Sequence, residues 1–283
     1  MLPGQPSQTL LRAAIRRAAH QSLDHPRIFE DPVVVGLVPE ADDPTILETL
    51  DDPGAPSAKL FRVLFAVRNR FAEDRLALAA TRGIRQYLML GAGLDTFAWC
   101  QPDFARRMHI FAADLPASLA WTQQRIRKRG MALPPNLTFV PLDLETKQIA
   151  DRLISYGFQA QLPTFCSALG LTQFLSPEAV GVMLGFASSL SKQSEIVFSF
   201  VLPNFELDGD DLSAAIHSDA RTTALGEPWR TRLRKSELFE RLTGLGFSSI
   251  SHLSPDLARQ RYFPNLLDVP NPPRWEQLIA AIV

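Results

Sequence analysis

The sequence predicts an α/β fold with a doubly wound, mostly parallel sheet, and two observations support this prediction. Short apolar segments alternate with helical segments through the middle of the chain, as in parallel strands joined by helical crossovers. The first apolar segment, Tyr87 to Leu90, has no polar residue to face solvent and ends abruptly at Gly91 and Gly93. A strand buried on both faces and followed by a glycine turn is typical of the ligand-binding edge of such a sheet.

Seven strands are expected in this sheet. The five parallel strands are expected at 87–90, 108–113, 137–141, 164–168 and 196–201, with helical crossovers at 117–129, 147–156 and 177–190. A helix at 236–245 is followed by two later strands, at 248–253 and 278–283, which are separated by a long connection. This hairpin-like finish predicts one antiparallel strand beside the parallel ones.

The N-terminal part predicts a helical cap. Residues 7–23 place apolar side chains on one side of a helix and basic ones on the other, with Ser7 as a plausible N-cap. Short structured pieces around 28–29 and 33–37 interrupt a connection rich in proline and aspartate, and a helix at 59–81 leads into the first strand. We therefore divide the chain into a cap or lid, residues 1–58, and a core, residues 59–283. An insertion at 203–235 is expected to cover the substrate site.

Composition excludes several function classes. The chain has 283 residues, of which 46% are hydrophobic and 21% charged, as in a globular protein. Its 29 basic and 30 acidic residues give no electrostatic footprint for a nucleic-acid partner. Cys100 and Cys166 lie in apolar settings without metal-ligand spacing, so we expect free thiols in a reducing cytoplasm and no metal site.

Neither a signal peptide nor a membrane partner is expected. The first 30 residues carry several arginines and lack the apolar core of a signal peptide. The uncharged stretch 153–177 is interrupted by glutamines and a proline, which predicts a loop, a buried strand and a turn. The oligomeric state is left open.

Carboxylates follow the next two strands. Asp114 ends the second strand close to the spacing of about 20 residues after Gly91 at which an acidic side chain takes ribose hydroxyls. Asp143 follows the third strand. The dinucleotide-binding motif G-x-G-x-x-G has a third glycine at the position of Thr96, so the glycine turn alone is weak evidence for a nucleotide site. The three strand ends together predict a nucleoside-binding site.

With these residues placed, the chain resembles the leucine carboxyl methyltransferase family of S-adenosylmethionine-dependent class I methyltransferases. It is most similar to the bacterial branch, which includes polyketide-tailoring O-methyltransferases. The matching motifs are Arg17-Ala18-Ala19-His20, Phe29-Glu30-Asp31-Pro32, Val67-Arg68-Asn69-Arg70-Phe71, Leu90-Gly91-Ala92-Gly93-Leu94-Asp95-Thr96, Asp114-Leu115-Pro116, Asp143-Leu144, Leu169-Gly170-Leu171-Thr172-Gln173-Phe174-Leu175, Gly226-Glu227-Pro228-Trp229 and Leu245-Gly246-Phe247.

The resemblance implies a binding set for S-adenosyl-L-methionine. It gives the methionine part of the cofactor to the glycine turn, the ribose hydroxyls to Asp114, the adenine to Asp143 with Leu144, and the methionine carboxylate to Arg68. A planar guanidinium matches a carboxylate in a bidentate pair, which makes the last role chemically reasonable. The predicted set is Arg68, Gly91, Ala92, Gly93, Asp114, Leu115, Asp143, Leu144 and Leu169.

Four positions depart from related patterns. Met89 stands where many class I enzymes have an acidic residue, and Asp95 replaces their third glycine, which is this family's own habit. Leu169 falls at the family's frequent glutamate and Phe174 at its tyrosine. A leucine cannot accept a hydrogen bond from the cofactor ammonium. These departures keep open a protein that binds ligand, or cyclises a substrate, without methyl transfer.

The implied activity is O-methylation of a small molecule such as a natural product, with a carboxylate as the favoured acceptor. A carboxylate needs no general base, only cations or donors to hold it, whereas a phenol or alcohol needs a base such as His20, His217 or His252. Arg16 and His20, one helical turn apart, are candidate substrate contacts on the cap. Trp229 and Arg230 are candidates in the insertion. No catalytic residue is assigned.

The rival enzyme class is a nicotinamide-dependent reductase that uses the same sheet edge. Thr96 in place of a glycine and the lack of a Tyr-x-x-x-Lys pair argue against it.

Overall fold

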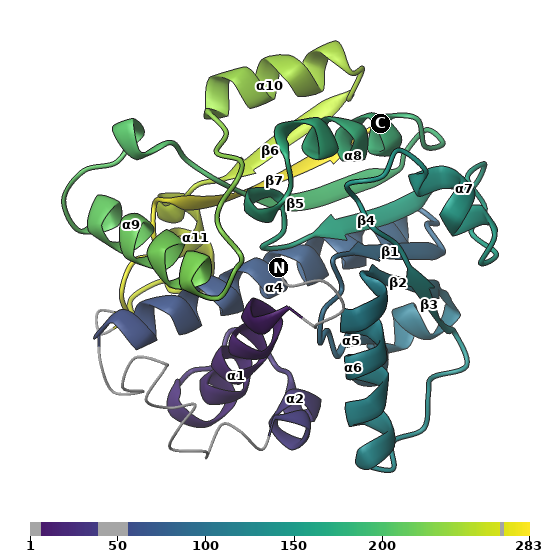
Figure 1. Ribbon diagram of the computed structural model, residues 1–283, viewed down its shortest axis with the longest axis horizontal. Helices are drawn as coiled ribbons and strands as arrows, with labels where there is room; N and C mark the ends of the chain where they lie inside the picture. The colour runs from purple at the N-terminus through teal and green to yellow at the C-terminus, as the bar shows by residue number, and fades with distance from the viewer. Residues whose placement is uncertain (1–6, 39–55, 267–268) are drawn as a thin grey trace.

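The computed structural model describes residues 7–38, 56–266 and 269–283, and its centre is one mixed sheet (Figure 1). The strand order is β3-β2-β1-β4-β5-β7-β6. The strands are β1 (Gln86–Leu90), β2 (His109–Asp114), β3 (Leu137–Pro141), β4 (Thr164–Ala168), β5 (Glu195–Val201), β6 (Ser249–Leu253) and β7 (Glu276–Ile282). Only β7 runs against its neighbours in this sheet, β5 and β6, so the prediction of a seven-stranded sheet with one antiparallel strand is confirmed.

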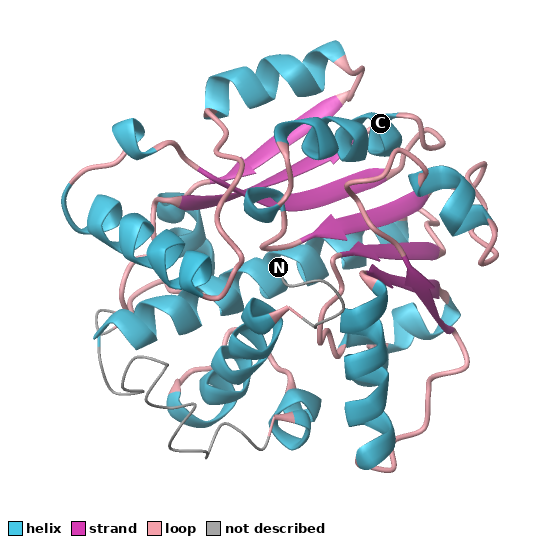
Figure 2. Ribbon diagram, in the orientation of Figure 1, coloured by secondary structure: helices cyan, strands magenta, loops and turns pink. Residues whose placement is uncertain are grey.

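Helices lie on both sides of this sheet (Figure 2). The α-helices of the described residues are α1 (Gln8–Leu23), α2 (Pro32–Leu37), α4 (Pro56–Thr81), α5 (Phe97–Cys100), α6 (Pro116–Lys128), α7 (Ile149–Ile154), α8 (Pro177–Ser188), α9 (Gly209–Ala224), α10 (Lys235–Gly244) and α11 (Pro255–Tyr262). Three short 3-10 helices are η2 (Asp103–Arg107), η3 (Thr172–Phe174) and η4 (Asn204–Glu206).

Alternate side chains of the strands pack into two apolar cores, one on each face of the sheet. In β1, Leu88 and Leu90 face a core completed by α7, α8 and α10. Tyr87 and Met89 face the opposite core, which α5, η2 and α11 complete. Helix α4 contributes side chains to both cores. Burial on both faces explains why the parallel strands read as continuous apolar runs.

A third cluster joins the N-terminal segment to the sheet edge. Apolar side chains of α1 and α2 pack with Leu94, which follows the glycine turn, and with Ile126 of α6. Figure 1 shows α1 and α2 beside α6, below the ends of the central strands. Helices α1 and α2 therefore lie at the sheet edge, whereas the role of residues 1–58 as a cap and the division of the chain at residue 58 stay predictions.

Several predicted boundaries move. The short piece at 33–37 is α2, whereas 28–29 is bent chain, and the predicted connection at 39–55 lies outside the described residues. The insertion contains the helix α9, and sequence analysis missed α5 and α11. Strand β7 begins at Glu276 rather than 278, and this shift matters for the site described below.

Both cysteines are free thiols, with Cys166 buried and Cys100 partly exposed. Among the described residues, no helix combines the length and apolar character that a membrane crossing needs.

Candidate active site

A cavity of about 460 Å³ opens at the carboxyl ends of the central strands. Its walls come from the strand tips, from α1 and α4, and from the segment after α9. All nine residues of the predicted cofactor set line it. The sequence therefore placed these residues at one cavity, while their individual contacts with a cofactor stay predictions.

The glycine turn forms the floor of the cavity. Gly91 has a φ of +68°, which L side chains rarely adopt, and a Cβ there would lie 2.9 Å from the side chain of Leu171. Its backbone N–H donates to the carbonyl of Ala113 on β2 over 2.9 Å. Only glycine can hold this backbone so close to its neighbours and to a ligand above them.

Asp114 at the tip of β2 is held by backbone donors. The N–H of Gly93 donates to its Oδ2 over 2.6 Å, and the N–H of Leu115 donates to Oδ1 over 2.7 Å. Burial raises the pKa of Asp114 to about 6, although these two hydrogen bonds act in the opposite direction. A carboxylate has about four lone-pair sites, so acceptor capacity for ribose hydroxyls remains.

The tip of β3 supplies a polar and an apolar group. Asp143 is exposed, and its Oδ1 accepts the N–H of Glu145 over 2.9 Å, whereas Leu144 is buried. An apolar side chain next to hydrogen-bonding groups suits the face and edge of a planar base.

Arg68 on α4 is buried at the opposite wall. Its Nη1 lies 3.1 Å from Oε1 of Glu276, and its guanidinium lies over the ring of Phe65 at 4.3 Å. Its Nε is buried without a hydrogen-bond partner among the described residues. A guanidinium has five N–H donors, so Arg68 can hold Glu276 and a ligand carboxylate together.

The turn after β4 is shaped around this guanidinium. Gly170 has a φ of +63°, and a Cβ there would lie 2.2 Å from Arg68 Nη1. Its N–H donates to Ser199 Oγ on β5 over 2.7 Å. Leu169 lines the cavity as an apolar side chain, so any acceptor for a ligand ammonium must come from other groups in this wall.

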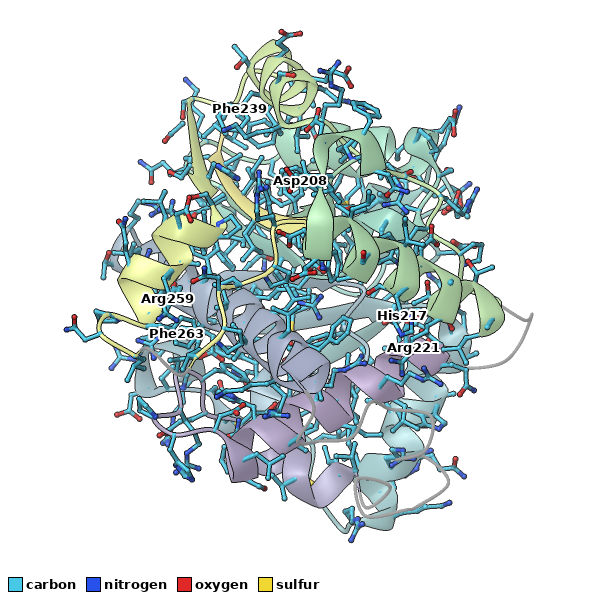
Figure 3. The ribbon with its side chains drawn as sticks, turned by 90° about the vertical axis from the view of Figure 1, so that its left-hand side faces the viewer. Asp208, His217, Arg221, Phe239, Arg259 and Phe263 are labelled. Atoms are coloured by element: carbon cyan, nitrogen blue, oxygen red, sulfur yellow. The ribbon has the colours of Figure 1, made fainter. Side chains whose placement is uncertain are left out.

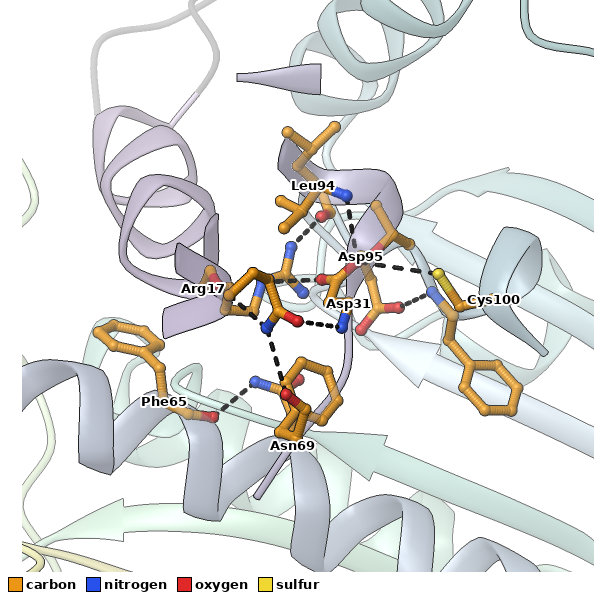
Figure 4. A network of polar contacts seen from close by, with 12 residues as sticks. Arg17, Asp31, Phe65, Asn69, Leu94, Asp95 and Cys100 are labelled. Atoms are coloured by element: carbon orange, nitrogen blue, oxygen red, sulfur yellow. Dashed lines mark hydrogen bonds and ion pairs between the residues drawn. The ribbon is translucent and has the colours of Figure 1, made fainter. Parts of the chain in front are cut away.

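A polar network fixes the cap helices to the glycine turn (Figure 4). Arg17 of α1 donates to the carbonyl of Leu94 and lies 3.7 Å from Asp31, which caps α2. Thr96 Oγ1 donates to the same carboxylate. The Nδ2 of Asn69 donates to the carbonyl of Phe65 over 2.8 Å, within α4. This network therefore links α1 and the start of α2 to the residues that follow the glycine turn.

Glu227 joins the cap to the insertion. Its carboxylate accepts hydrogen bonds from the N-terminus of α1, namely from Ser7 Oγ at 2.9 Å, Gln8 N at 2.7 Å and Thr9 Oγ1 at 2.6 Å. An acidic group is favourable at this end of a helix because of the free N–H groups there. Glu227 itself lines the cavity, so α1 and the segment after α9 meet at the cavity wall.

The predicted substrate contacts are placed differently from one another. Arg16, Trp229 and Arg230 line the cavity. Arg16 lies over the ring of Phe61 at 4.3 Å, and Arg230 pairs with Glu145 at 2.6 Å. This pair and hydrogen bonds from Ser176 hold the pKa of Glu145 below its ordinary value, although burial opposes them.

The three histidines considered as bases are not brought to the cavity. His20 lies outside its lining, and its Nδ1 is 2.9 Å from Asp24. His217 is exposed on α9, beside Arg221 in Figure 3. His252 on β6 lies 2.6 Å from Gln277, and burial lowers its pKa while that contact raises it. The suggestion that His20 acts with Arg16 on the substrate is therefore corrected, because His20 faces Asp24 instead.

Sequence reasoning missed several lining residues. Trp275 precedes the last strand, Glu276 begins it, and Gln173 lies in η3. Glu276 was overlooked because the strand was expected to begin two residues later. An acidic residue at the start of a buried strand is the signal that was available.

The fold and this cavity define an α/β enzyme class that binds a nucleoside cofactor at the carboxyl edge of its sheet, as class I methyltransferases do. The family model of leucine carboxyl methyltransferase matches residues 10–187. The chain belongs to this family, and the resemblance drawn from the motifs is confirmed.

Relatives agree with this assignment. A protein from Bacillus subtilis (strain 168), named putative S-adenosyl-L-methionine-dependent methyltransferase YktD, is 26% identical over 95% of each chain. A putative methyltransferase of the same type from Saccharopolyspora erythraea is 29% identical over 72% of this chain and 71% of that one.

Solved structures share the fold at low identity. A DUF574 family protein from Streptomyces avermitilis has a TM-score of 0.61 and 16% identity, with 96% of each chain covered. A putative methyltransferase from Thermobifida fusca has a TM-score of 0.57 and 17% identity, with 99% of this chain and 96% of that one covered.

Proposed function

We propose that this protein is an O-methyltransferase that converts the carboxylate of a small organic acid, such as a natural product, to its methyl ester. S-adenosyl-L-methionine is the cofactor, in line with the names of the relatives. The main support for this proposal is that one cavity joins the strand-tip residues to a wall of aromatic rings and guanidinium groups.

The residues present fit the cofactor. Arg68, with its unpartnered buried Nε, would hold the methionine carboxylate, and Asp114 would accept the ribose hydroxyls. Leu144 would cover the adenine. When bound, the sulfonium supplies an activated methyl group, which passes to a carboxylate oxygen as the carbon–sulfur bond breaks and leaves S-adenosylhomocysteine and the ester.

This chain's own task is to hold the acceptor and to exclude water. Arg16 lies over the rings of Phe61 and Phe65, at 4.3 and 5.8 Å, so its guanidinium brings positive charge to the acceptor side, while Arg68 pairs with Glu276. An ionised carboxylate is favoured there and has no proton to lose. The segment that carries Trp229 and Arg230 would close over it.

The test uses labelled S-adenosylmethionine and a panel of organic acids and phenols. A carboxylate acceptor gives a methyl ester, which releases labelled methanol in alkali. Label that survives alkali as a methyl ether would identify a hydroxyl acceptor instead. If calorimetry detects S-adenosylhomocysteine binding but no acceptor is methylated, a protein that binds or cyclises its ligand without methyl transfer becomes the better explanation. Protection by NADH and not by the sulfonium compound would revive the reductase.

A further inference from the structure

The aromatic wall of the cavity comes from three separate segments of the chain. Trp229 belongs to the segment after α9, Trp275 precedes β7, and Phe61 lies on α4. The two indole rings lie 5.3 Å apart at 32°, and Phe61 meets Trp275 edge-on at 6.2 Å. Such a wall offers ring faces and edges to a flat partner.

Polar atoms in the same wall have unused hydrogen-bonding capacity. The indole Nε1 atoms of Trp229 and Trp275 are buried and have no partner among the described residues. The side-chain Oε1 of Gln173 is buried without a partner as well, although its backbone carbonyl accepts the N–H of Arg230 over 2.7 Å. Buried indole N–H groups usually find an acceptor, and these two donors and one acceptor belong to residues that line the cavity.

Other contacts tie this wall to the reacting end of the site. Trp275 is adjacent to Glu276, which pairs with Arg68, and Arg68 packs on Gly170 at the tip of β4. The guanidinium of Arg16 lies over Phe61. The wall therefore adjoins the place predicted for the methionine end of the cofactor, where an acceptor must lie.

We infer that Trp229, Trp275 and Gln173 form the acceptor subsite and that it selects a planar aromatic acid carrying a further polar group on its ring. This inference rests on the proposed function. The indole N–H groups donate to oxygen atoms of the acceptor, the rings contact its flat face, and Gln173 Oε1 accepts from a hydroxyl or amino substituent. A flexible aliphatic acid matches neither the ring faces nor the rigid donors.

The test compares hydroxynaphthoic acid with decanoic acid in methyl transfer and in calorimetry with S-adenosylhomocysteine present. Trp229→Phe and Trp275→Phe keep a ring and remove the N–H. Each is expected to raise KM for the aromatic acid about tenfold, with kcat changed less than about twofold, because a hydrogen bond is lost in both ground and transition states. Affinity for S-adenosylhomocysteine is expected to stay unchanged, which shows that each variant folds.

Trp99→Phe is the matched control, because its indole N–H donates to the carbonyl of Ala132 outside this cavity over 2.9 Å. It is expected to leave KM unchanged. Aromatic acids that bind without being methylated would contradict the proposed function and keep the subsite. Equal use of decanoic acid, with both tryptophan variants unchanged, would overturn the subsite and keep methyl transfer.

Discussion

At the scale of single residues, charged groups of the site are used more than once. Asp114 accepts two backbone hydrogen bonds within the protein and is proposed to accept ribose hydroxyls as well. Arg68 pairs with Glu276 and is proposed to take a ligand carboxylate. Such contacts within the protein hold the site in the geometry that the ligand needs, which lowers the cost of binding.

Replacing Asp114 by asparagine is expected to weaken binding of S-adenosylhomocysteine by about 10- to 100-fold, the range for losing hydrogen bonds to a charged acceptor. The carboxamide oxygen can still accept from Gly93, so the fold is expected to survive. Calorimetry measures the affinity. Asp151→Asn, on the exposed side of α7, is the control and is expected to change nothing. Equal affinities for both variants would contradict the role of Asp114.

The same carboxylate predicts a pH dependence. Since its pKa is raised to about 6, Asp114 takes up a proton as the pH falls through that value and loses its charge as an acceptor. Affinity for S-adenosylhomocysteine is expected to fall by up to about tenfold per pH unit below 6 in the wild type. In Asp114→Asn this part of the pH dependence is expected to be absent, and calorimetry between pH 5 and 7.5 measures it.

The buried pair of Arg68 and Glu276 predicts strong coupling in stability. Arg68→Met leaves a buried carboxylate without its partner and is expected to cost about 3 kcal/mol of unfolding free energy. The double variant with Glu276→Gln is expected to recover most of that loss. Urea unfolding measures all three. The control is Arg70→Met, on the same helix but about half exposed. It is expected to cost at most about 1 kcal/mol of unfolding free energy. Additive losses in the double variant would show that the pair is not coupled.

At the scale of elements, the site is closed by segments that are far apart in the sequence. Helix α1 reaches the glycine turn through Leu10, whose Cγ would lie 3.3 Å from a Cβ at Gly93, and through Arg17. The segment after α9 reaches α1 through Glu227. Access to the cavity therefore depends on contacts between elements and not on one loop alone.

Glu227→Gln is expected to loosen the N-terminus of α1, because a neutral amide oxygen accepts the same donors less strongly than a carboxylate. We expect a loss of about 1 kcal/mol, within the range for helix caps, and faster amide exchange confined to α1 and residues 226–231. Hydrogen exchange by mass spectrometry measures this. Glu240→Gln on the exposed side of α10 is the control. Uniformly faster exchange across the sheet would instead indicate global destabilisation.

At the scale of the whole molecule, an acidic group on α4, Glu73, links stability to pH. Burial, together with the nearby carboxylates of Asp95 and Asp31, raises the pKa of Glu73 to about 8, although Arg70 acts in the opposite direction. The folded protein therefore binds more protons than the unfolded chain between the ordinary value of 4.5 and 8. Stability from this group falls as the pH rises through that window and is lost above pH 8.

Glu73→Gln removes this penalty, since a neutral amide has no proton to lose. Its melting temperature is expected to exceed that of the wild type at pH 9 by several degrees, with a smaller difference at pH 5. Thermal unfolding followed by circular dichroism measures it. Glu178→Gln, exposed on α8, is the control. A constant difference between variant and wild type across all pH values would contradict the raised pKa.

Much of the fold was predictable because it depends on patterns that are local in the sequence. Alternating apolar and helical segments gave the parallel strands, and the positions of Gly91, Asp114 and Asp143 at strand ends placed them at one edge. Helices α5 and α11 were missed, because they are short and lack a long apolar period. The partner of Arg68 was missed because Glu276 lies 208 residues away in the sequence. The role suggested for His20 overlooked Asp24, which contacts its ring four residues further along the chain.

The sequence by itself determined the sheet, its glycine turn, the family and the strand-end residues, because each depends on neighbours along the chain or on the pleat of a strand. The tertiary structure alone decided which further side chains line the cavity on the side proposed for the acceptor. Trp229, Trp275 and Arg16 meet only when three distant segments fold over one strand edge, and no local periodicity records which buried donors are left without partners.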